Sequence, residues 1–319
     1  MALIVREKQV RELLSMRDTV TVLEDAFHAQ SQGLVMNQSR TRLAFGNGVL
    51  TILAASAPTS GVVGFKTYTA FREGMRYVVM LFSAQNGELL AIIEADYLGA
   101  MRTGGTSAVA TKYLARTNAR NVGLIGAGQQ AVTQLMGVCA VRPITSVRVY
   151  SRKQPERELF CHEMSRLLNI EVTPVDDVRA VVANADILIT ATNARDPVFH
   201  GEWLKTGCHI NAIGSNWVQR REIDLSTLHR SMLIVTDSLE QARKEAGDFV
   251  IPADEELFQW ERVHELCEIV GDEGPQRESP EEITLYKGLG IALEDVVTAA
   301  HVYFLAVKQG LGEEIDLLD

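Results

Sequence analysis

The sequence predicts an α/β protein built around a Rossmann-type, doubly wound parallel sheet. Short apolar strands alternate with helical patterns through the middle of the chain, and one of these strands leads directly into a glycine-rich turn. Strands that alternate with helices form parallel sheets with helices on both faces. We therefore expect a ligand at the carboxyl ends of the strands.

The glycine-rich turn has the pattern G-x-G-x-x-A, with Gly126, Gly128 and Ala131 at the defining positions. Gly126 permits the tight turn, Gly128 lets backbone approach a pyrophosphate, and Ala131 lets helix and strand pack closely. Gln129 and Gln130 precede an apolar stretch of helical periodicity, and the first N–H groups of that helix can bind phosphate. The pattern alone also fits an ordinary strand, turn and helix, so its context has to support it.

A second strand is expected at residues 146–150, about twenty residues after the glycines. An acidic residue at its end would hold the ribose 2′-hydroxyl of NAD. This chain has Ser151, Arg152 and Lys153 there, a hydroxyl and two cations that suit a 2′-phosphate. The motif therefore predicts an NAD(P) cofactor and favours NADP. The alternative is that Arg152 and Lys153 are solvated loop cations.

The remaining sheet follows the same alternation. We expect further strands at 170–174, 186–192, 208–214 and 232–236, and helices at 156–168, 175–183 and 239–247. The apolar run within 186–192 suits a strand buried on both faces. Six polar or small residues end two of these strands, and we expect them at the ligand: Thr190, Thr192, Asn193, Gly214, Ser215 and Asn216.

The residues before the glycine-rich turn have a different character. Sequential strands with hairpin-like turns predict a largely antiparallel or mixed sheet. The expected strands are 40–43, 48–54, 62–69, 77–83 and 89–95, and the expected helices are 18–32 and 96–115. The polar stretch 271–282 is an expected exposed loop, and the apolar helix 291–310 is expected to pack back on the first domain.

Length and charge limit the possible functions. A chain of 319 residues exceeds the usual single core, and a net charge of −10 argues against nucleic acid or an anionic membrane as a partner. No apolar run reaches the roughly 18 residues of a membrane span, and the first residues lack a signal-peptide layout. The four cysteines and seven histidines show no metal spacing. We expect a cytoplasmic protein with reduced cysteines and no metal.

Five segments, in order, resemble the ornithine cyclodeaminase/mu-crystallin family: 101–115, 125–131, 185–192, 209–215 and 286–295. The resemblance covers essentially the whole chain. It implies a Rossmann-type NAD(P)-binding domain, which we place at 116–290, inserted in an α+β substrate-binding and dimerisation domain at 1–115 plus 291–319. It also implies a homodimer and oxidoreductase chemistry on small α-amino or α-imino acids.

Lys66 lies in a predicted strand of apolar character, and a charge in such surroundings needs a partner. It matches the family lysine that contacts the substrate carboxylate and can relay a proton, so we expect the substrate and cofactor to be its partners. The alternative is an edge-strand lysine that points to solvent.

Arg102 resembles the family arginine that forks onto the substrate α-carboxylate, a task that suits guanidinium geometry. The alternative is a surface helix arginine. Arg40 resembles a further carboxylate-binding arginine. Arg42 lies two residues on, on the same side of the strand. We favour Arg40, because family members often have Arg-Thr there, and keep Arg42 as the alternative.

Asn216 departs from the family, whose cyclodeaminases and related alanine dehydrogenase have an acid/base aspartate at this position. Asparagine forms hydrogen bonds but exchanges no proton at neutral pH. Cyclodeamination needs several proton transfers, whereas reduction of a protonated imine needs hydride delivery and carboxylate anchoring. Imine reduction is therefore favoured over cyclodeamination. Asp224 lies too far along the chain to replace the missing carboxylate.

The resemblance assigns four further residues to the cofactor: Thr103, Arg220, Lys287 and Gly288. Arg220 matches a family lysine, although with Arg221 it also suits an acidic substrate side chain or a solvated turn. Gly288 replaces the usual serine, which puts one side-chain hydrogen bond in doubt.

We therefore expect an NAD(P)H-dependent imine or ketimine reductase, or an amino-acid dehydrogenase that runs the same reaction backwards. The α-carboxylate would be held by Arg40, Lys66 and Arg102, with Lys66 and Asn216 at the reacting group. Two alternatives stay open: a true cyclodeaminase that releases ammonia, and a non-catalytic, NADP-dependent ligand-binding protein similar to mu-crystallin.

Overall fold

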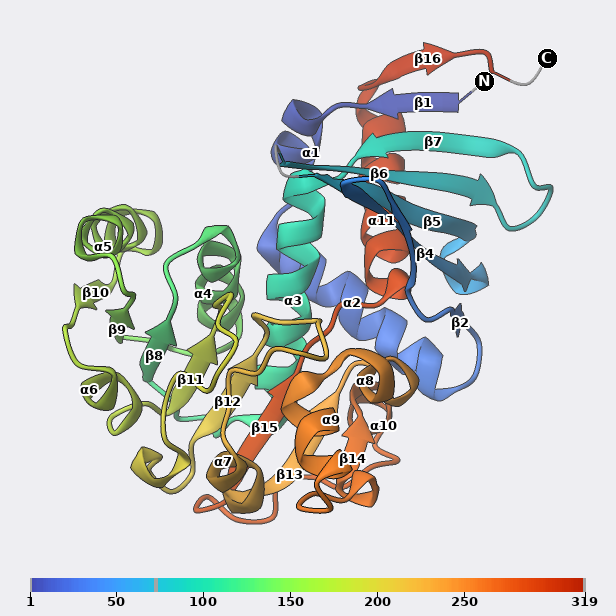
Figure 1. Cartoon of the computed structure of the whole chain (residues 1–319). Helices are drawn as coiled ribbons and strands as arrows, with labels where there is room; N and C mark the ends of the chain where they lie inside the picture. Colours follow the sequence, from blue (N-terminus) through green and yellow to red (C-terminus); the bar gives the residue numbers. More distant parts are fainter. Residues whose placement is uncertain (1, 72–73, 318–319) are drawn as a thin grey trace. The chain divides into compact units, whose positions relative to one another are not determined.

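Two compact units make up the chain. The computed structural model describes residues 2–71 and 74–317. Unit 1 combines Met1–Thr106 with Gly290–Asp319, and unit 2 is the segment Ser107–Leu289 between them. The first division falls inside helix α3, after residue 106, whereas the boundary drawn from the sequence follows residue 115. Figure 1 colours both units along the chain.

Unit 1 is built from one sheet and the helices that cover it. Its strands are β1 (Ala2–Val5), β2 (Met36–Asn37), β3 (Thr41–Phe45), β4 (Gly48–Ala57), β5 (Val62–Phe71), β6 (Gly74–Ser83), β7 (Leu89–Glu94) and β16 (Glu313–Ile315). Its helices are α1 (Glu7–Leu13), α2 (Met16–Ser31), the first part of α3 (Asp96–Leu114) and α11 (Ala292–Gln309), with a 3₁₀ turn at Pro58–Ser60.

The sheet of unit 1 is mixed, as expected. Its order is β16-β1-β7-β6-β5-β4-β2, with β3 also paired to β4. Strands β1 and β7 run parallel, and the other neighbours run antiparallel. Helix α11 packs against β4, β5 and β6. Strand β5 is therefore an interior strand whose side chains face a helix.

Unit 2 holds the parallel sheet. Its strands are β8 (Asn121–Ile125), β9 (Ser146–Tyr150), β10 (Glu171–Pro174), β11 (Ile187–Thr190), β12 (His209–Ala212), β13 (Ser231–Thr236), β14 (Val263–Glu265) and β15 (Ile283–Lys287). Its helices are α4 (Gln129–Val141), α5 (Gln154–Leu168), α6 (Val178–Val182), α7 (Leu225–Arg230), α8 (Leu239–Glu245), α9 (Gly247–Asp254) and α10 (Leu266–Val270), with 3₁₀ turns at Gly201–Trp203 and Trp260–Arg262.

The sheet of unit 2 has the order β10-β9-β8-β11-β12-β15-β13-β14, and all adjacent pairs are parallel. The first five strands follow the Rossmann order, in which the chain leaves the first strand outward and then returns to its other side. Strand β8, which precedes the glycine-rich turn, therefore lies at the point where the order reverses. A ligand crevice is expected there.

Apolar side chains cover both faces of this sheet. On β11, Ile187 and Ile189 pack in a core cluster with residues of α4 and α5, whereas Leu188 packs in a second cluster with residues of α6 and α7. Successive strand side chains point to opposite faces. The doubly wound parallel sheet predicted from the sequence is thus confirmed.

The sequence analysis missed several strands. Strand β15 follows the polar stretch 271–282 and inserts between β12 and β13, although we expected no strand after residue 236. Strands β1, β14 and β16 were missed because they are short and lie outside the alternating pattern. The helix expected at 239–247 is interrupted at Ala246, where ψ is 86°, so that α8 and α9 are separate helices. Among the described residues, every helix is too short or too polar to span a lipid bilayer.

Candidate active site

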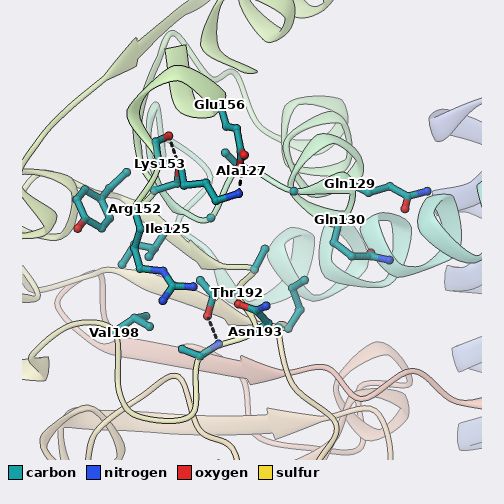
Figure 2. Close-up of a pocket in the computed structure, with 18 of the residues that line it drawn as sticks. Ile125, Ala127, Gln129, Gln130, Arg152, Lys153, Glu156, Thr192, Asn193 and Val198 are labelled. Carbon is teal, nitrogen blue, oxygen red and sulfur yellow. Dashed lines mark hydrogen bonds and ion pairs between the residues drawn. The ribbon is translucent and has the colours of Figure 1, made fainter. Parts of the chain in front are cut away.

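A cavity of about 710 Å³ opens at the glycine-rich turn of unit 2 (Figure 2). Its walls come from the carboxyl ends of β8, β9, β11 and β12 and from the start of α4. Ten of the residues assigned to a cofactor line it: Gly126, Gly128, Gln129, Gln130, Ser151, Arg152, Lys153, Thr192, Asn193 and Gly214. The structure thus places residues from four separate loops, all expected at the cofactor, around one cavity.

The two glycines of the turn differ in the space around them. Gly126 has a φ of +114°, and a Cβ atom there would lie 2.4 Å from the carbonyl oxygen of Ala191. A Cβ atom at Gly128 would meet no atom within 4 Å. Gly128 is also the N-cap of α4. The backbone therefore leaves an open cradle at the start of a helix, which fits a dinucleotide pyrophosphate.

The two cations of the loop after β9, Arg152 and Lys153, point in different directions. Figure 2 shows Arg152 reaching toward Thr192 and Asn193, whereas Lys153 turns to Glu156. The Lys153 Nζ atom lies 2.7 Å from Oε1 of Glu156, and both side chains are largely exposed. Exposed pairs of this kind contribute little energy, but Glu156 offsets the charge of Lys153. Arg152 is therefore the stronger candidate for a contact with a 2′-phosphate.

Glu222, which the sequence analysis passed over, lies behind Thr192 and Gly214. It accepts hydrogen bonds from the Thr192 backbone N–H and hydroxyl, each at 2.7 Å, from the Gly214 N–H at 2.7 Å and from the Thr190 hydroxyl at 2.9 Å. Thr190 is fully buried, so it supports the cavity wall from behind. Burial raises the pKa of Glu222.

Lys287 is also fully buried. Its Nζ atom donates to the carbonyl oxygen of Ser215 at 2.8 Å and pairs with Asp248 at 2.8 Å. The ammonium therefore supports the loop after β12 from inside the protein. Gly288 donates its N–H to the carbonyl of Ala212.

Three more expected residues lie elsewhere. Arg220 lies in the loop between β12 and α7, where its backbone N–H bonds to the Trp217 carbonyl. Thr103 belongs to α3 in unit 1, and its hydroxyl donates to the carbonyl of Gly99. Ser215 is buried, and its Oγ accepts from the Trp217 N–H.

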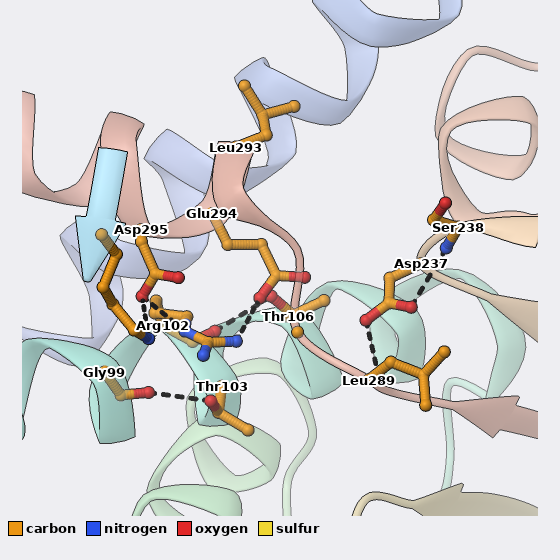
Figure 3. Close-up of polar contacts among 12 residues, drawn as sticks. Gly99, Arg102, Thr103, Thr106, Asp237, Ser238, Leu289, Leu293, Glu294 and Asp295 are labelled. Atoms are coloured by element: carbon orange, nitrogen blue, oxygen red, sulfur yellow. Dashed lines mark hydrogen bonds and ion pairs between the residues drawn. The ribbon is translucent and has the colours of Figure 1, made fainter. Parts of the chain in front are cut away.

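Unit 1 contains a buried cluster of charges (Figure 3). Lys66 on β5 is 3% exposed, and its Nζ lies 2.8 Å from Oδ1 of Asp295. The same oxygen accepts from Nε of Arg102 at 2.9 Å, and Arg102 also pairs with Glu294 at 2.7 Å. The partner expected for Lys66 was a bound ligand, but the structure supplies Asp295 from α11. An exposed lysine on an edge strand is excluded.

Arg40 joins this cluster through the backbone. Its guanidinium donates to the Gly290 carbonyl at 2.8 Å, and a Cβ atom at Gly290 would lie 2.3 Å from Nη1 of Arg102. The two arginines therefore approach the same glycine. Arg42 is half-buried on β3, opposite Thr51 of β4.

Lys66 has an altered protonation equilibrium. Burial and then the charge of Arg102 lower its pKa to about 8, with a smaller contribution from Arg40, while Asp295 opposes the shift. Lys66 and Arg102 share the carboxylate of Asp295, and Arg40 and Arg102 approach the same glycine, so three cations come together in unit 1. Such a cluster suits one added carboxylate.

Asn216 lies in the loop after β12, half-buried. Asp224 caps helix α7, with Oδ1 accepting from the Thr227 N–H at 2.8 Å. This role as a helix cap agrees with our expectation that Asp224 does not replace a carboxylate at position 216. Asp295, Glu294, Glu222 and Asp248 are the polar residues that the sequence analysis missed, because their partners are distant in the sequence.

Comparisons with known proteins identify the family of this chain. Residues 2–310 match the model of the ornithine cyclodeaminase/mu-crystallin family. A Delta(1)-pyrroline-2-carboxylate reductase of Bacillus cereus is 34% identical, over 98% of this chain and 99% of its own length. The structure of Thermococcus litoralis Delta(1)-pyrroline-2-carboxylate reductase with NADH and L-proline has a TM-score of 0.94 and 36% identity, covering 98% of this chain and 100% of its own. An archaeal alanine dehydrogenase dimer with bound NAD has a TM-score of 0.93 and 30% identity, covering 99% of each chain.

Proposed function

Because the chain belongs to the ornithine cyclodeaminase/mu-crystallin family, we propose that its substrate is a cyclic α-imino carboxylate, Δ1-pyrroline-2-carboxylate, and its product L-proline. The protein is an NAD(P)-dependent oxidoreductase that acts on the C=N bond of small α-imino acids. The convergence of the three cations Lys66, Arg102 and Arg40 in unit 1 carries the proposal.

The substrate carboxylate is assigned to unit 1. Arg102 and Arg40 offer guanidinium groups, which bind carboxylates in a fixed, two-pronged geometry. Lys66 adds an ammonium whose pKa, about 8, allows it to hold or release a proton near neutral pH. Its Nζ is the group that we assign to proton delivery as the imine is reduced.

The cofactor is assigned to the cavity of unit 2. Gly126, Gly128 and the first residues of α4 would hold the pyrophosphate, and Ser151 with Arg152 would hold the adenosine ribose. Thr192, Asn193 and Ser215 would hold the nicotinamide half. When bound, the nicotinamide supplies the hydride that adds to the imine carbon.

Asn216 favours reduction over cyclodeamination. Reduction adds one hydride and one proton, and the substrate nitrogen can arrive protonated. Cyclodeamination also requires oxidation of an amine, loss of ammonia and ring closure, each with its own proton transfer. A positioned acid/base group contributes about 10²–10⁴-fold to such steps, and an asparagine cannot provide it.

Three finer assignments belong to the same proposal. Arg152, with Ser151, favours NADP over NAD. The exposed apolar side chains Phe45, Phe71 and Met75 of unit 1 suit a contact with a second copy, hence a homodimer. The four free cysteines, three of them buried, suit the reducing cytoplasm.

The decisive experiment follows NADPH and NADH oxidation by the purified chain with Δ1-pyrroline-2-carboxylate, piperideine-2-carboxylate, iminosuccinate, or 2-oxo acids plus amines. We expect the pyrroline to be reduced fastest. Lys66→Ala should abolish turnover while cofactor affinity, measured by fluorescence titration, changes less than about twofold, since the cofactor cavity is lined by unit 2. A silent screen would contradict the proposal and favour a ligand-binding protein. Strong ammonia release from ornithine would favour a cyclodeaminase.

A further inference from the structure

Glu222 occupies an unusual position for a carboxylate. It follows the charged pair Arg220–Arg221 in the loop between β12 and α7, where the sequence indicates a solvated turn. The structure buries it completely instead, with 0% of the residue exposed. A buried carboxylate is costly unless donors surround it, so its donors indicate its role.

Its two oxygens bind two different strand ends. Oε1 accepts from the N–H and the hydroxyl of Thr192, just after β11. Oε2 accepts from the Thr190 hydroxyl on β11 and from the Gly214 N–H, just after β12. Glu222 therefore ties the ends of neighbouring strands together at the edge where Thr192 and Gly214 line the cavity.

Gly214 is closely packed where the ends of β11 and β12 meet. A Cβ atom at this position would lie 2.2 Å from the Thr192 carbonyl oxygen and 2.4 Å from Oε1 of Glu222. Either contact would push the two strand ends apart. The absence of a side chain at Gly214 thus allows Glu222 to approach both strand ends.

A second buried carboxylate fixes Glu222 itself. Oδ1 of Asp248, on α9, accepts from the backbone N–H groups of Glu222 at 2.6 Å and Ile223 at 3.1 Å. The other oxygen of Asp248 pairs with Lys287, which also donates to the Ser215 carbonyl. Thr192, Gly214 and Ser215 are therefore all held from behind by this buried network.

We propose that Glu222 is a positioning residue for the nicotinamide half of the cofactor. It acts through Thr192 and Gly214, whose backbone and side-chain positions it sets. The hydrogen bonds of Glu222 described above go to Thr190, Thr192 and Gly214, whereas we assign the glycine-rich turn and the Ser151–Lys153 loop to the other half of a dinucleotide. This inference rests on the proposed function, because it assumes that the cavity of unit 2 binds a dinucleotide.

The test compares two ligands on one set of variants. Glu222→Gln keeps the side-chain shape but turns one acceptor into an amide donor, which faces the donors of Thr192 or Gly214. Thr190→Val removes one donor to Glu222 at a residue buried behind the cavity wall. Asp186→Asn is the matched control, because Asp186 is a buried carboxylate that accepts from the backbone N–H groups of Arg120 and Asn121 at the amino end of β11.

Affinities for NADPH and for 2′-phospho-ADP-ribose, which is the same dinucleotide without the nicotinamide, are measured by titration calorimetry, and folding is checked by thermal melting. In Glu222→Gln we expect NADPH to bind at least about tenfold more weakly, with 2′-phospho-ADP-ribose within about twofold. Thr190→Val should also weaken the binding of NADPH, by a smaller factor. Asp186→Asn should lower the melting temperature and leave both affinities unchanged.

Equal losses for the two ligands in Glu222→Gln, or no loss for NADPH, would overturn the positioning role while the proposed function stands. If Glu222→Gln does not fold, an unchanged NADPH affinity in Thr190→Val would overturn it. An unmodified protein that binds neither NADPH nor NADH would overturn both the inference and the proposed function.

Discussion

The Lys66 ammonium lies 2.8 Å from Oδ1 of Asp295, and both side chains are almost completely buried. The two residues come from opposite ends of the sequence, on β5 and α11. Removing one partner of a buried charge pair leaves the other charge uncompensated and lowers the free energy of unfolding by about 3–5 kcal/mol. The pair is therefore held together in the folded protein. Asp295 therefore orients Lys66 before any substrate arrives.

Substrate affinity should fall as Lys66 loses its proton. Burial and Arg102 lower its pKa to about 8, so the positive charge that attracts a carboxylate is present below pH 8 and lost above it. We expect KM for the imino acid to rise above this pH, approaching about tenfold per pH unit. Steady-state kinetics from pH 6 to 10 measure this dependence.

Lys66→Arg is the control for that profile, because arginine keeps its charge throughout this range. Arginine cannot replace Lys66 in proton delivery, so the two proteins are compared by the pH dependence of their affinity for L-proline, titrated with cofactor bound. An identical loss of this affinity above pH 8 in both proteins would show that Lys66 is not the group responsible.

Arg152 should determine the cofactor preference. Its guanidinium reaches into the cavity, whereas Lys153 is paired with Glu156. Arg152→Ala should weaken NADPH binding by about tenfold or more and leave NADH nearly unchanged, since a charge-assisted contact with the 2′-phosphate is lost. Lys153→Ala is the matched variant and should change either affinity less than about threefold, the effect of an exposed pair. Equal affinities for NADPH and NADH in the unmodified protein would refute the NADP assignment.

Asn216 should prevent cyclodeamination. The purified protein, incubated with ornithine and NAD(P), should release no ammonia above background in a coupled glutamate dehydrogenase assay. Asn216→Asp restores a titratable group and should raise any trace of ammonia release, by up to about 10²-fold. Robust release by the unmodified protein would show that the missing carboxylate is dispensable.

The two glycines of the turn should respond differently to alanine. At Gly126 the positive φ and the Ala191 carbonyl oxygen 2.4 Å from the new Cβ should lower stability by about 1–3 kcal/mol. At Gly128 the new methyl group enters open space, so the melting temperature should stay constant while dinucleotide affinity falls. Calorimetry and titration on both variants separate the effects. A destabilised Gly128→Ala would contradict this account.

Local patterns predicted the parallel sheet of unit 2 and many of the residues that line its cavity. The turn at Gly126–Gly128 and the residues after β9, β11 and β12 are encoded within short segments, where glycine geometry and apolar runs act directly. Glu222 and Asp295 could not be found this way. Glu222 stands among charged residues that suggest exposure, and Asp295 pairs with a lysine more than two hundred positions earlier. Strand β15 was missed for the same reason, since its neighbours β12 and β13 precede it by long segments.

The position of β15 also constrains how the chain acquires its structure during synthesis. Strands β13 and β14 leave the ribosome before β15, yet β13 joins the sheet only through it, because β12 pairs with β15 and not with β13. Until residue 287 has emerged, the nascent protein has two separate sets of strands with exposed edges, and such edges attract wrong partners. The parallel sheet of unit 2 is therefore completed only after residue 287, when the residues of its other strands have already been made.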